Sequence, residues 1–175
     1  MPFLTERVNR TRAIAKKPGI TMCANVLRPE SLGSIHIKST NPADPPAINF
    51  NFLSNEMDRH GLLFAIRKGR ELMATLPVSG IVGNEIAPGI EQTSDEELLD
   101  WVRNNAETTY HPVGTCKMGH DPMSVVDSEL KVHGIKSLRI ADASIMPTLT
   151  SGNTNAPCIM IGEKCATMIL KETGV

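Results

Sequence analysis

The feature that most constrains the fold is a change in the spacing of apolar residues along the chain. Between residues 20 and 53, apolar and polar side chains alternate, which is the pattern of strands with one buried face. Turn-forming Pro and Gly residues separate the runs. The sequence therefore predicts three short antiparallel strands, which centre on residues 22–26, 35–37 and 48–52.

From Asn55 the apolar residues recur every three or four positions until Pro77. This spacing predicts an amphipathic helix. A second helix is predicted to begin at Ser94, because Ser94 and Glu97 have the spacing of a capping box, in which each side chain bonds the backbone N–H of the other.

A third helix is predicted over residues 156–171, with Asn155 as its N-cap and Pro157 in its first turn. Before it, residues 137–141 have the apolar character of a short strand. No repeat, linker or low-complexity tract interrupts the chain. We therefore expect residues 1–175 to form a single α+β domain, in which an antiparallel sheet is covered by helices.

Charge and composition exclude several classes of protein. Eighteen Lys and Arg residues face 19 Asp and Glu residues, and aromatic residues make up 3% of the chain, so a basic or base-stacking surface for nucleic acid is not expected. No apolar run approaches the roughly 18–20 residues of a membrane span. The N-terminal residues lack the pattern of a secretory signal, so we expect a cytoplasmic chain without a transmembrane span.

A loop with two histidines and two glycines, residues 110–120, is the first candidate site. His111 precedes a proline, which favours an extended backbone and places the imidazole on a structured loop. An imidazole has an ordinary pKa near 6.5 and suits proton transfer at neutral pH. A lone histidine more often only forms local hydrogen bonds, and from the residues alone both interpretations remain open.

A second candidate is the polar loop of residues 150–157, which leads directly into the third helix. The unpaired N–H groups at a helix start favour negative charge that develops beside them. Ser and Asn also cap helices without any catalytic role, so the ordinary structural interpretation stands beside the functional one.

A metal site is not expected. Three possible ligands lie within ten residues, but their spacing matches no common zinc pattern, and the four cysteines form no C-x-x-C pair. Free thiols are the simpler expectation. The residues weighed as ligands are His111, Cys116, His120, His133, Cys158 and Cys165.

Several motifs follow one another in a fixed order between residues 110 and 164. They cover residues 110–119, 124–127, 132–134, 138–148, 152–157 and 159–164. Residues 28–31, 41–46 and 94–97 fit the same pattern. On these motifs the chain resembles the C-terminal part of the glucose-methanol-choline (GMC) flavin oxidoreductases, and it is most similar to alcohol dehydrogenase (acceptor) and choline dehydrogenase-like members.

The resemblance implies an FAD enzyme that moves a hydride from the carbon of a small alcohol to the flavin N5, while a base accepts the hydroxyl proton. His111 matches the catalytic histidine of the family. Asn153 matches its usual partner, whose carboxamide would bond the substrate oxygen.

The resemblance also implies where the cofactor lies. Asp142 and Ala143 match backbone positions beside the ribityl and diphosphate groups of FAD. Asn153, Thr154 and Asn155 match residues close to the flavin, with Asn155 at the pyrimidine edge of the ring.

The family's Gly-rich βαβ region for FAD is absent from these residues. The implied fold is the substrate domain of the family, plus a C-terminal strand and helix that would complete an FAD-binding domain. We expect the chain alone not to retain FAD and to need a separate FAD-binding segment as its partner. The alternative is a catalytically silent fragment or interaction module that lacks its flavin-binding half.

Overall fold

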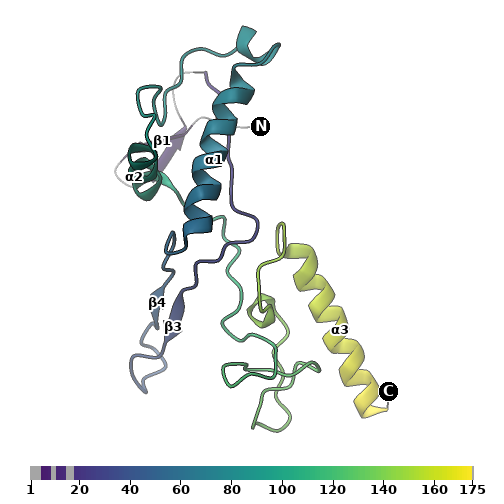
Figure 1. The fold of residues 1–175 in the computed structure, drawn as a ribbon. Helices are drawn as coiled ribbons and strands as arrows, with labels where there is room; N and C mark the ends of the chain where they lie inside the picture. Colours follow the sequence, from purple (N-terminus) through teal and green to yellow (C-terminus); the bar gives the residue numbers. More distant parts are fainter. Residues whose placement is uncertain (1–4, 9–10, 15–17, 175) are drawn as a thin grey trace. The chain divides into compact units, whose positions relative to one another are not determined.

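The chain contains two compact units, which Figure 1 shows as a ribbon in a computed structural model. One unit is formed by Met1–Val26 and Glu56–Glu107, and the other by Leu27–Asn55 and Thr108–Val175. The single domain expected over residues 1–175 stays a prediction. The structure describes residues 5–8, 11–14 and 18–174.

The first unit begins with a hairpin that the sequence analysis did not predict. Strands β1 (Thr5–Val8) and β2 (Thr11–Ile14) pair antiparallel, with Thr5 opposite Ile14. The unit continues with helix α1 (Glu56–Met73), the short 3-10 helix η1 (Val78–Gly80) and helix α2 (Asp95–Asn105). Both predicted α-helices of this region are therefore confirmed.

The capping box at the start of α2 is confirmed. The Glu97 N–H donates to the Ser94 hydroxyl at 3.3 Å, and the Ser94 N–H donates to the Glu97 carboxylate at 3.0 Å. The Ser94 hydroxyl also donates to the Glu97 carboxylate at 2.8 Å, and this bond, followed by that of the Ser94 N–H, lowers the pKa of Glu97 below its ordinary value. Leu98 and Val102 form the buried side of the helix.

The predicted strand at residues 22–26 is wrong, because this segment packs on a helix instead of a sheet. A Cβ atom added to Gly69 of α1 would lie 2.1 Å from the Met22 methyl carbon, and one added to Gly61 would lie 3.2 Å from a Val26 methyl carbon. The two glycines lie eight positions apart, on one face of α1. The alternating apolar residues therefore meet a helix, and the segment runs beside α1 (Figure 1).

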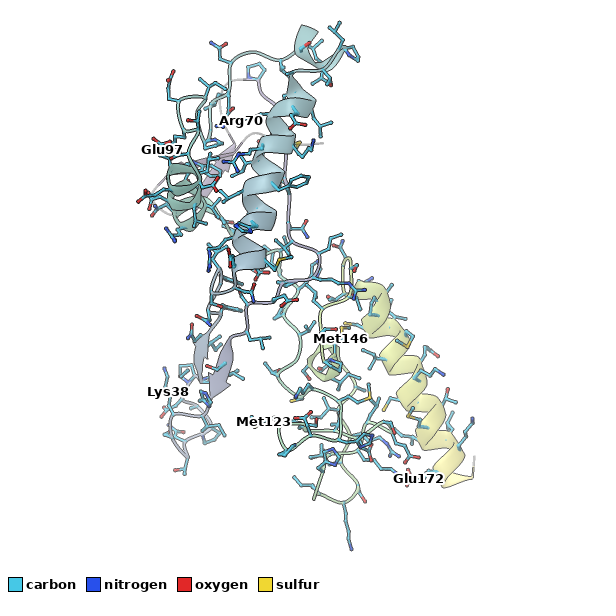
Figure 2. All side chains as sticks on the ribbon, in the orientation of Figure 1. Lys38, Arg70, Glu97, Met123, Met146 and Glu172 are labelled. Carbon is cyan, nitrogen blue, oxygen red and sulfur yellow. The ribbon has the colours of Figure 1, made fainter. Side chains whose placement is uncertain are left out.

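The C-terminal half of α1 is tied to the loop of residues 85–92 by one arginine. The Arg70 guanidinium donates to both oxygens of the Glu85 carboxylate, at 2.9 and 3.0 Å. It also donates to the Gly89 and Gln92 carbonyls, each at 2.9 Å. Figure 2 labels Arg70 on α1 and Glu97 on α2.

The second unit contains a two-stranded antiparallel sheet. Strands β3 (Ser34–His36) and β4 (Ala47–Asn49) pair with Ile35 opposite Ile48. Two of the three predicted strands are thus found. With three α-helices and two small antiparallel sheets in the described residues, the α+β class is confirmed.

The core of the second unit lies between a loop segment, the 3-10 helix η2 (Ala143–Ile145) and helix α3 (Asn155–Thr173). Met146, which follows η2, lies beside α3 (Figure 2). The buried members of this core are Val126, Leu130, Ile145, Met146, Ile161 and Cys165.

The predicted strand at residues 137–141 is not formed. Ser137 has φ of 60°, which breaks the extended backbone at the start of the segment. Beyond it, Arg139 forms only an isolated antiparallel bridge with Lys131. The segment is therefore a short paired loop that leads to η2.

No helix in the described part of the chain has the length and apolar character to cross a bilayer. Each of the four cysteines is a free thiol, and Cys165 is the buried one.

We expect Ser94→Ala to lower the free energy of unfolding by about 0.5–2 kcal/mol, because the orphan N–H of Glu97 loses its acceptor. Chemical denaturation and hydrogen exchange of the α2 amides would measure the effect. Ser79→Ala, at an exposed serine of η1, is the matched control and should change neither value. An equal loss in both variants would contradict the assigned role of the cap.

Candidate active site

The loop that carries His111 is held against η2 by its backbone. The Cys116 N–H donates to the Ser144 carbonyl at 2.9 Å, and the Met118 N–H donates to the Ile145 carbonyl at 2.8 Å. The chain after His111 therefore runs alongside η2, as a strand would run along its neighbour.

A glycine allows the turn between His111 and this paired segment. Gly114 has φ of 88°, and a Cβ atom added there would lie 3.4 Å from the Met146 carbonyl oxygen. Residues other than glycine are strained at such a φ because they carry a Cβ atom. Gly114 therefore lets the chain fold back close to the Met146 carbonyl.

η2 is positioned by its own cap and by its packing on α3. Asp142 is its N-cap, and its carboxylate accepts the Ser144 N–H at 2.8 Å. Ile145 and Met146 are buried in the core shared with α3. Asp142 and Ala143, the two residues matched to the FAD ribityl and diphosphate region, therefore lie next to the loop of His111.

The loop before α3 is held by a residue far away in the sequence. The Arg28 guanidinium donates through Nε to the Ser151 hydroxyl at 2.6 Å, across 123 positions. This bond ties the segment before β3 to the polar loop of residues 150–154.

The two candidate loops meet at one hydrogen bond. Nδ1 of His111 lies 2.9 Å from Oγ1 of Thr154, 43 positions later. Thr154 is 7% exposed, His111 is half-buried, and the neighbours Asn153 and Asn155 are exposed. The structure thus brings His111 to the residue beside Asn153.

The predicted N-cap of the third helix is wrong by one residue. Thr154, not Asn155, is the N-cap of α3, and its hydroxyl makes no capping bond. Its backbone is helical, with φ of −83° and ψ of −3°, so α3 starts one residue earlier than the sequence pattern indicated. The hydroxyl faces His111 instead of a backbone N–H of the helix.

Sequence reasoning placed Thr154 only near the flavin and missed its contact with His111. It also missed the bond between Arg28 and Ser151. No local pattern indicates either contact, because the partners belong to different segments and meet only after the core has formed.

The loop that follows the candidate site is tightened by an acidic residue. The Ser124 hydroxyl donates to the Asp121 carboxylate at 2.6 Å, and the Lys117 ammonium lies 3.0 Å from it. These two bonds, the hydroxyl first, lower the pKa of Asp121 to about 2. The carboxylate therefore stays charged throughout the neutral range.

The possible metal ligands do not gather. Within the described ranges, no three His, Cys, Asp or Glu residues lie together as a cation site would require. His133 instead contacts the Gly119 carbonyl through Nε2 at 3.1 Å, and His120 is exposed.

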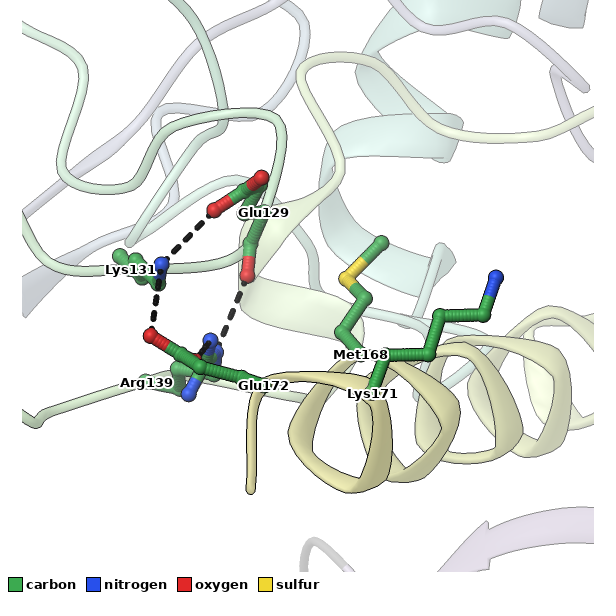
Figure 3. Close-up of a pocket in the computed structure, with 6 residues that line it drawn as sticks. All are labelled: Glu129, Lys131, Arg139, Met168, Lys171 and Glu172. Carbon is green, nitrogen blue, oxygen red and sulfur yellow. Dashed lines mark hydrogen bonds and ion pairs between the residues drawn. The ribbon is translucent and has the colours of Figure 1, made fainter. Parts of the chain in front are cut away.

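A pocket near the last turns of α3 is lined by charged side chains that form ion pairs with one another (Figure 3). We call these residues the ion-pair cluster. Nζ of Lys131 lies 2.8 Å from the Glu129 carboxylate and 3.1 Å from that of Glu172, and Arg139 also pairs with Glu172. The Arg139 bond, followed by the Lys131 bond, lowers the pKa of Glu172. These charges bind one another and anchor the C-terminal end of α3.

The family described as GMC oxidoreductase matches residues 29–162 of the chain through its C-terminal domain. The oxygen-dependent choline dehydrogenases of Escherichia coli K12 and Shigella flexneri serotype 5b are each 48% identical over 168 residues. The alignment covers 95% of this chain and 30% of each relative.

Solved structures give the same result. Pyridoxine 4-oxidase from Mesorbium loti superimposes with a TM-score of 0.76 and 33% identity, over 81% of this chain and 28% of that protein. An R554A variant of formate oxidase from Aspergillus oryzae RIB40 gives a TM-score of 0.76 and 34% identity, over 84% of this chain and 26% of that protein. The chain spans less than a third of the length of these relatives.

We expect Glu172→Gln to destabilise the second unit at neutral pH, because the ion-pair cluster loses its shared carboxylate. The folded-state pKa of Glu172 lies below the ordinary value of 4.5, so its contribution is present above that value and disappears as the pH falls through the folded-state pKa. Thermal unfolding from pH 7 to pH 3 should show the two proteins converging. Glu163→Gln, at an exposed glutamate of the same helix, is the control, and a constant gap at all pH values would contradict the assignment.

Proposed function

The chain belongs to the GMC oxidoreductase family, and from this premise we propose that it is the C-terminal part of an FAD-dependent enzyme that oxidises a small alcohol. The names of the relatives mention choline, pyridoxine and formate, and all of them are dehydrogenases or oxidases. The common feature is the redox chemistry, while the compound named differs between enzymes, and two of the three compounds, choline and pyridoxine, are alcohols. This is why the proposal names a substrate class only.

The observation that carries the proposal is the hydrogen bond between His111 and Thr154. It orients the imidazole through Nδ1 at the loop that also contains Asn153. Nε2 is then the nitrogen that remains for a substrate. A group held in this way is suited to act as a general base.

In the proposed reaction the alcohol oxygen gives its proton to Nε2 of His111, and its carbon gives up a hydride, which leaves a carbonyl product. FAD, when bound, supplies the acceptor for the hydride. The Asn153 carboxamide donates a hydrogen bond to the substrate oxygen and fixes it beside the imidazole. The residues of this chain therefore bind and orient the alcohol and hold its proton.

The start of α3 fits a cofactor that gains negative charge. Its first turn contains no acidic residue, so no carboxylate of that turn compensates the positive end of the helix dipole. The exposed Asn155 lies in that turn. In the proposal, Asn155 lies by the pyrimidine edge of the flavin with Thr154 close to the cofactor, and Asp142 and Ala143 at the start of η2 lie by the ribityl and diphosphate groups.

In the proposed enzyme, another segment covers the exposed apolar side chains near β3 and β4 of the second unit. On and after β3 and β4, large apolar side chains are exposed, and the exposure of Ile37 reaches 88%. Phe50 and Phe52 stack on each other with ring centroids 5.1 Å apart, and both are exposed. Large apolar side chains that are exposed together usually mark a surface that a partner covers. An FAD-binding segment, completed by residues 137–141 and α3, is the proposed partner.

The same exposed residues favour a second candidate, a catalytically silent interaction module. In that case the apolar surface binds a partner, and His111 serves only the fold. The two candidates differ in whether an FAD-binding segment restores redox activity.

We expect His111→Ala to lower kcat by about 10²- to 10⁴-fold, the usual contribution of a general base. The measurement uses the FAD-loaded complete enzyme, a panel of small alcohols, and both oxygen and a dye as acceptors. His120→Ala, at the exposed histidine of the same loop, is the matched control and should keep its activity. Equal turnover in the wild type and in His111→Ala would remove His111 from its role.

We expect the chain alone to bind no stoichiometric FAD, because most of the proposed cofactor contacts belong to the partner segment. Co-expression with an FAD-binding segment should give a coloured complex with one FAD per chain. Absorption spectroscopy after gel filtration would measure both. A coloured complex without activity on any alcohol would favour the silent module.

A further inference from the structure

The hydroxyl of Thr154 does not cap helix α3 and is hydrogen-bonded to His111 instead. The side chain is buried, and a buried hydroxyl without a partner is costly. The partner is Nδ1 of His111, at 2.9 Å. The contact therefore satisfies a buried polar group and fixes one nitrogen of the imidazole at the same time.

The two cap residues of α2 and α3 show the contrast. Ser94 accepts the N–H of Glu97, as an N-cap hydroxyl ordinarily does. Thr154 makes no such bond, although α3 begins at the next residue. The Cys158 N–H reaches the Thr154 carbonyl at 2.9 Å, so the first turn of α3 closes without the hydroxyl.

The tautomer of His111 decides whether Nε2 can accept a proton. A neutral imidazole carries its hydrogen on one nitrogen and a lone pair on the other. A base that takes a proton at Nε2 must carry its first hydrogen on Nδ1. Once protonated, it carries hydrogens on both nitrogens. Nδ1 is thus an N–H donor before and after the proton transfer, and its partner must accept in both states.

We propose that Thr154 is a positioning residue that holds His111 in the tautomer with hydrogen on Nδ1 and a free lone pair on Nε2. The hydroxyl oxygen accepts the Nδ1 hydrogen in the neutral and in the protonated ring. This inference rests on the proposed function for its catalytic meaning, but the tautomer itself is a property of this chain.

Threonine suits this task better than serine. Its branched Cβ restricts χ1, so the hydroxyl is held in a narrow range of directions. Of the residues 153–155, Thr154 is the buried one, and its neighbours are exposed. The restricted side chain keeps Oγ1 directed at His111 while the residues on either side remain available for ligands.

The first test is nitrogen NMR of the 175-residue chain labelled with ¹⁵N-histidine, with the His111 signals assigned by their loss in His111→Gln. In the wild type we expect a protonated Nδ1 and an unprotonated Nε2 at a pH where the ring is neutral. A wild-type ring with hydrogen on Nε2 overturns the proposal without the need for any variant.

The variants then separate the hydroxyl from the shape of the side chain. Thr154→Val keeps the branched shape and removes the acceptor, so we expect the population with hydrogen on Nε2 to rise. Thr154→Ser keeps the acceptor and should retain the wild-type tautomer. Circular dichroism confirms that each variant is folded. An unchanged tautomer in folded Thr154→Val overturns the proposal.

Kinetics of the FAD-loaded complete enzyme provide the second readout. We expect Thr154→Val to lower kcat by about 10²-fold, the cost of a misplaced catalytic group, with a smaller change in KM. Thr154→Ser should retain most of the wild-type kcat. If the NMR result holds while His111→Ala keeps full activity, the proposed function fails and the tautomer assignment stands. If Thr154→Val and Thr154→Ser lose equal activity, the positioning role fails.

Discussion

The packing of η2 on α3 is the interaction on which the candidate site depends. Ile145 and Met146 are buried together with residues of α3, so the two elements are fixed relative to each other. The carbonyls of Ser144 and Ile145 then accept the backbone of the segment that follows His111. One apolar contact therefore positions both loops of the site, and the bond between His111 and Thr154 is its consequence.

The two ends of α3 have different roles. At its start, the polar loop, a first helical turn without acidic residues and the buried hydroxyl of Thr154 lie beside His111. At its end, Glu172 binds Lys131 and Arg139, which belong to the segment that leads to η2. The ion-pair cluster and the apolar core thus hold the same helix at two places, which keeps the start of the helix in register with the loop of His111.

The apolar residues near β3 and β4 form a surface that the described part of the chain leaves exposed. A two-stranded hairpin has little stability of its own. Here Ile48 and both phenylalanines remain exposed. The relatives are more than three times as long as the part that this chain matches, and in the proposed enzyme their additional length supplies the cover. The same length would supply most of the FAD site.

Signals that act within four positions were sufficient for α1, for α2 with its capping box, and for most of α3, because a helix bonds residues that are close in sequence. The resemblance indicated His111 and Asn153 as site residues, and these roles, like the extended backbone that Pro112 favours at His111, stay predictions. Packing decided the rest. The apolar alternation of residues 22–26 is typical of a strand, but the segment packs on α1 at Gly61 and Gly69. Thr154 has no local signal that separates it from other polar residues, and its bond with His111 exists only in the folded structure. Such contacts join segments that are distant in sequence, and only the tertiary structure determines which segments meet.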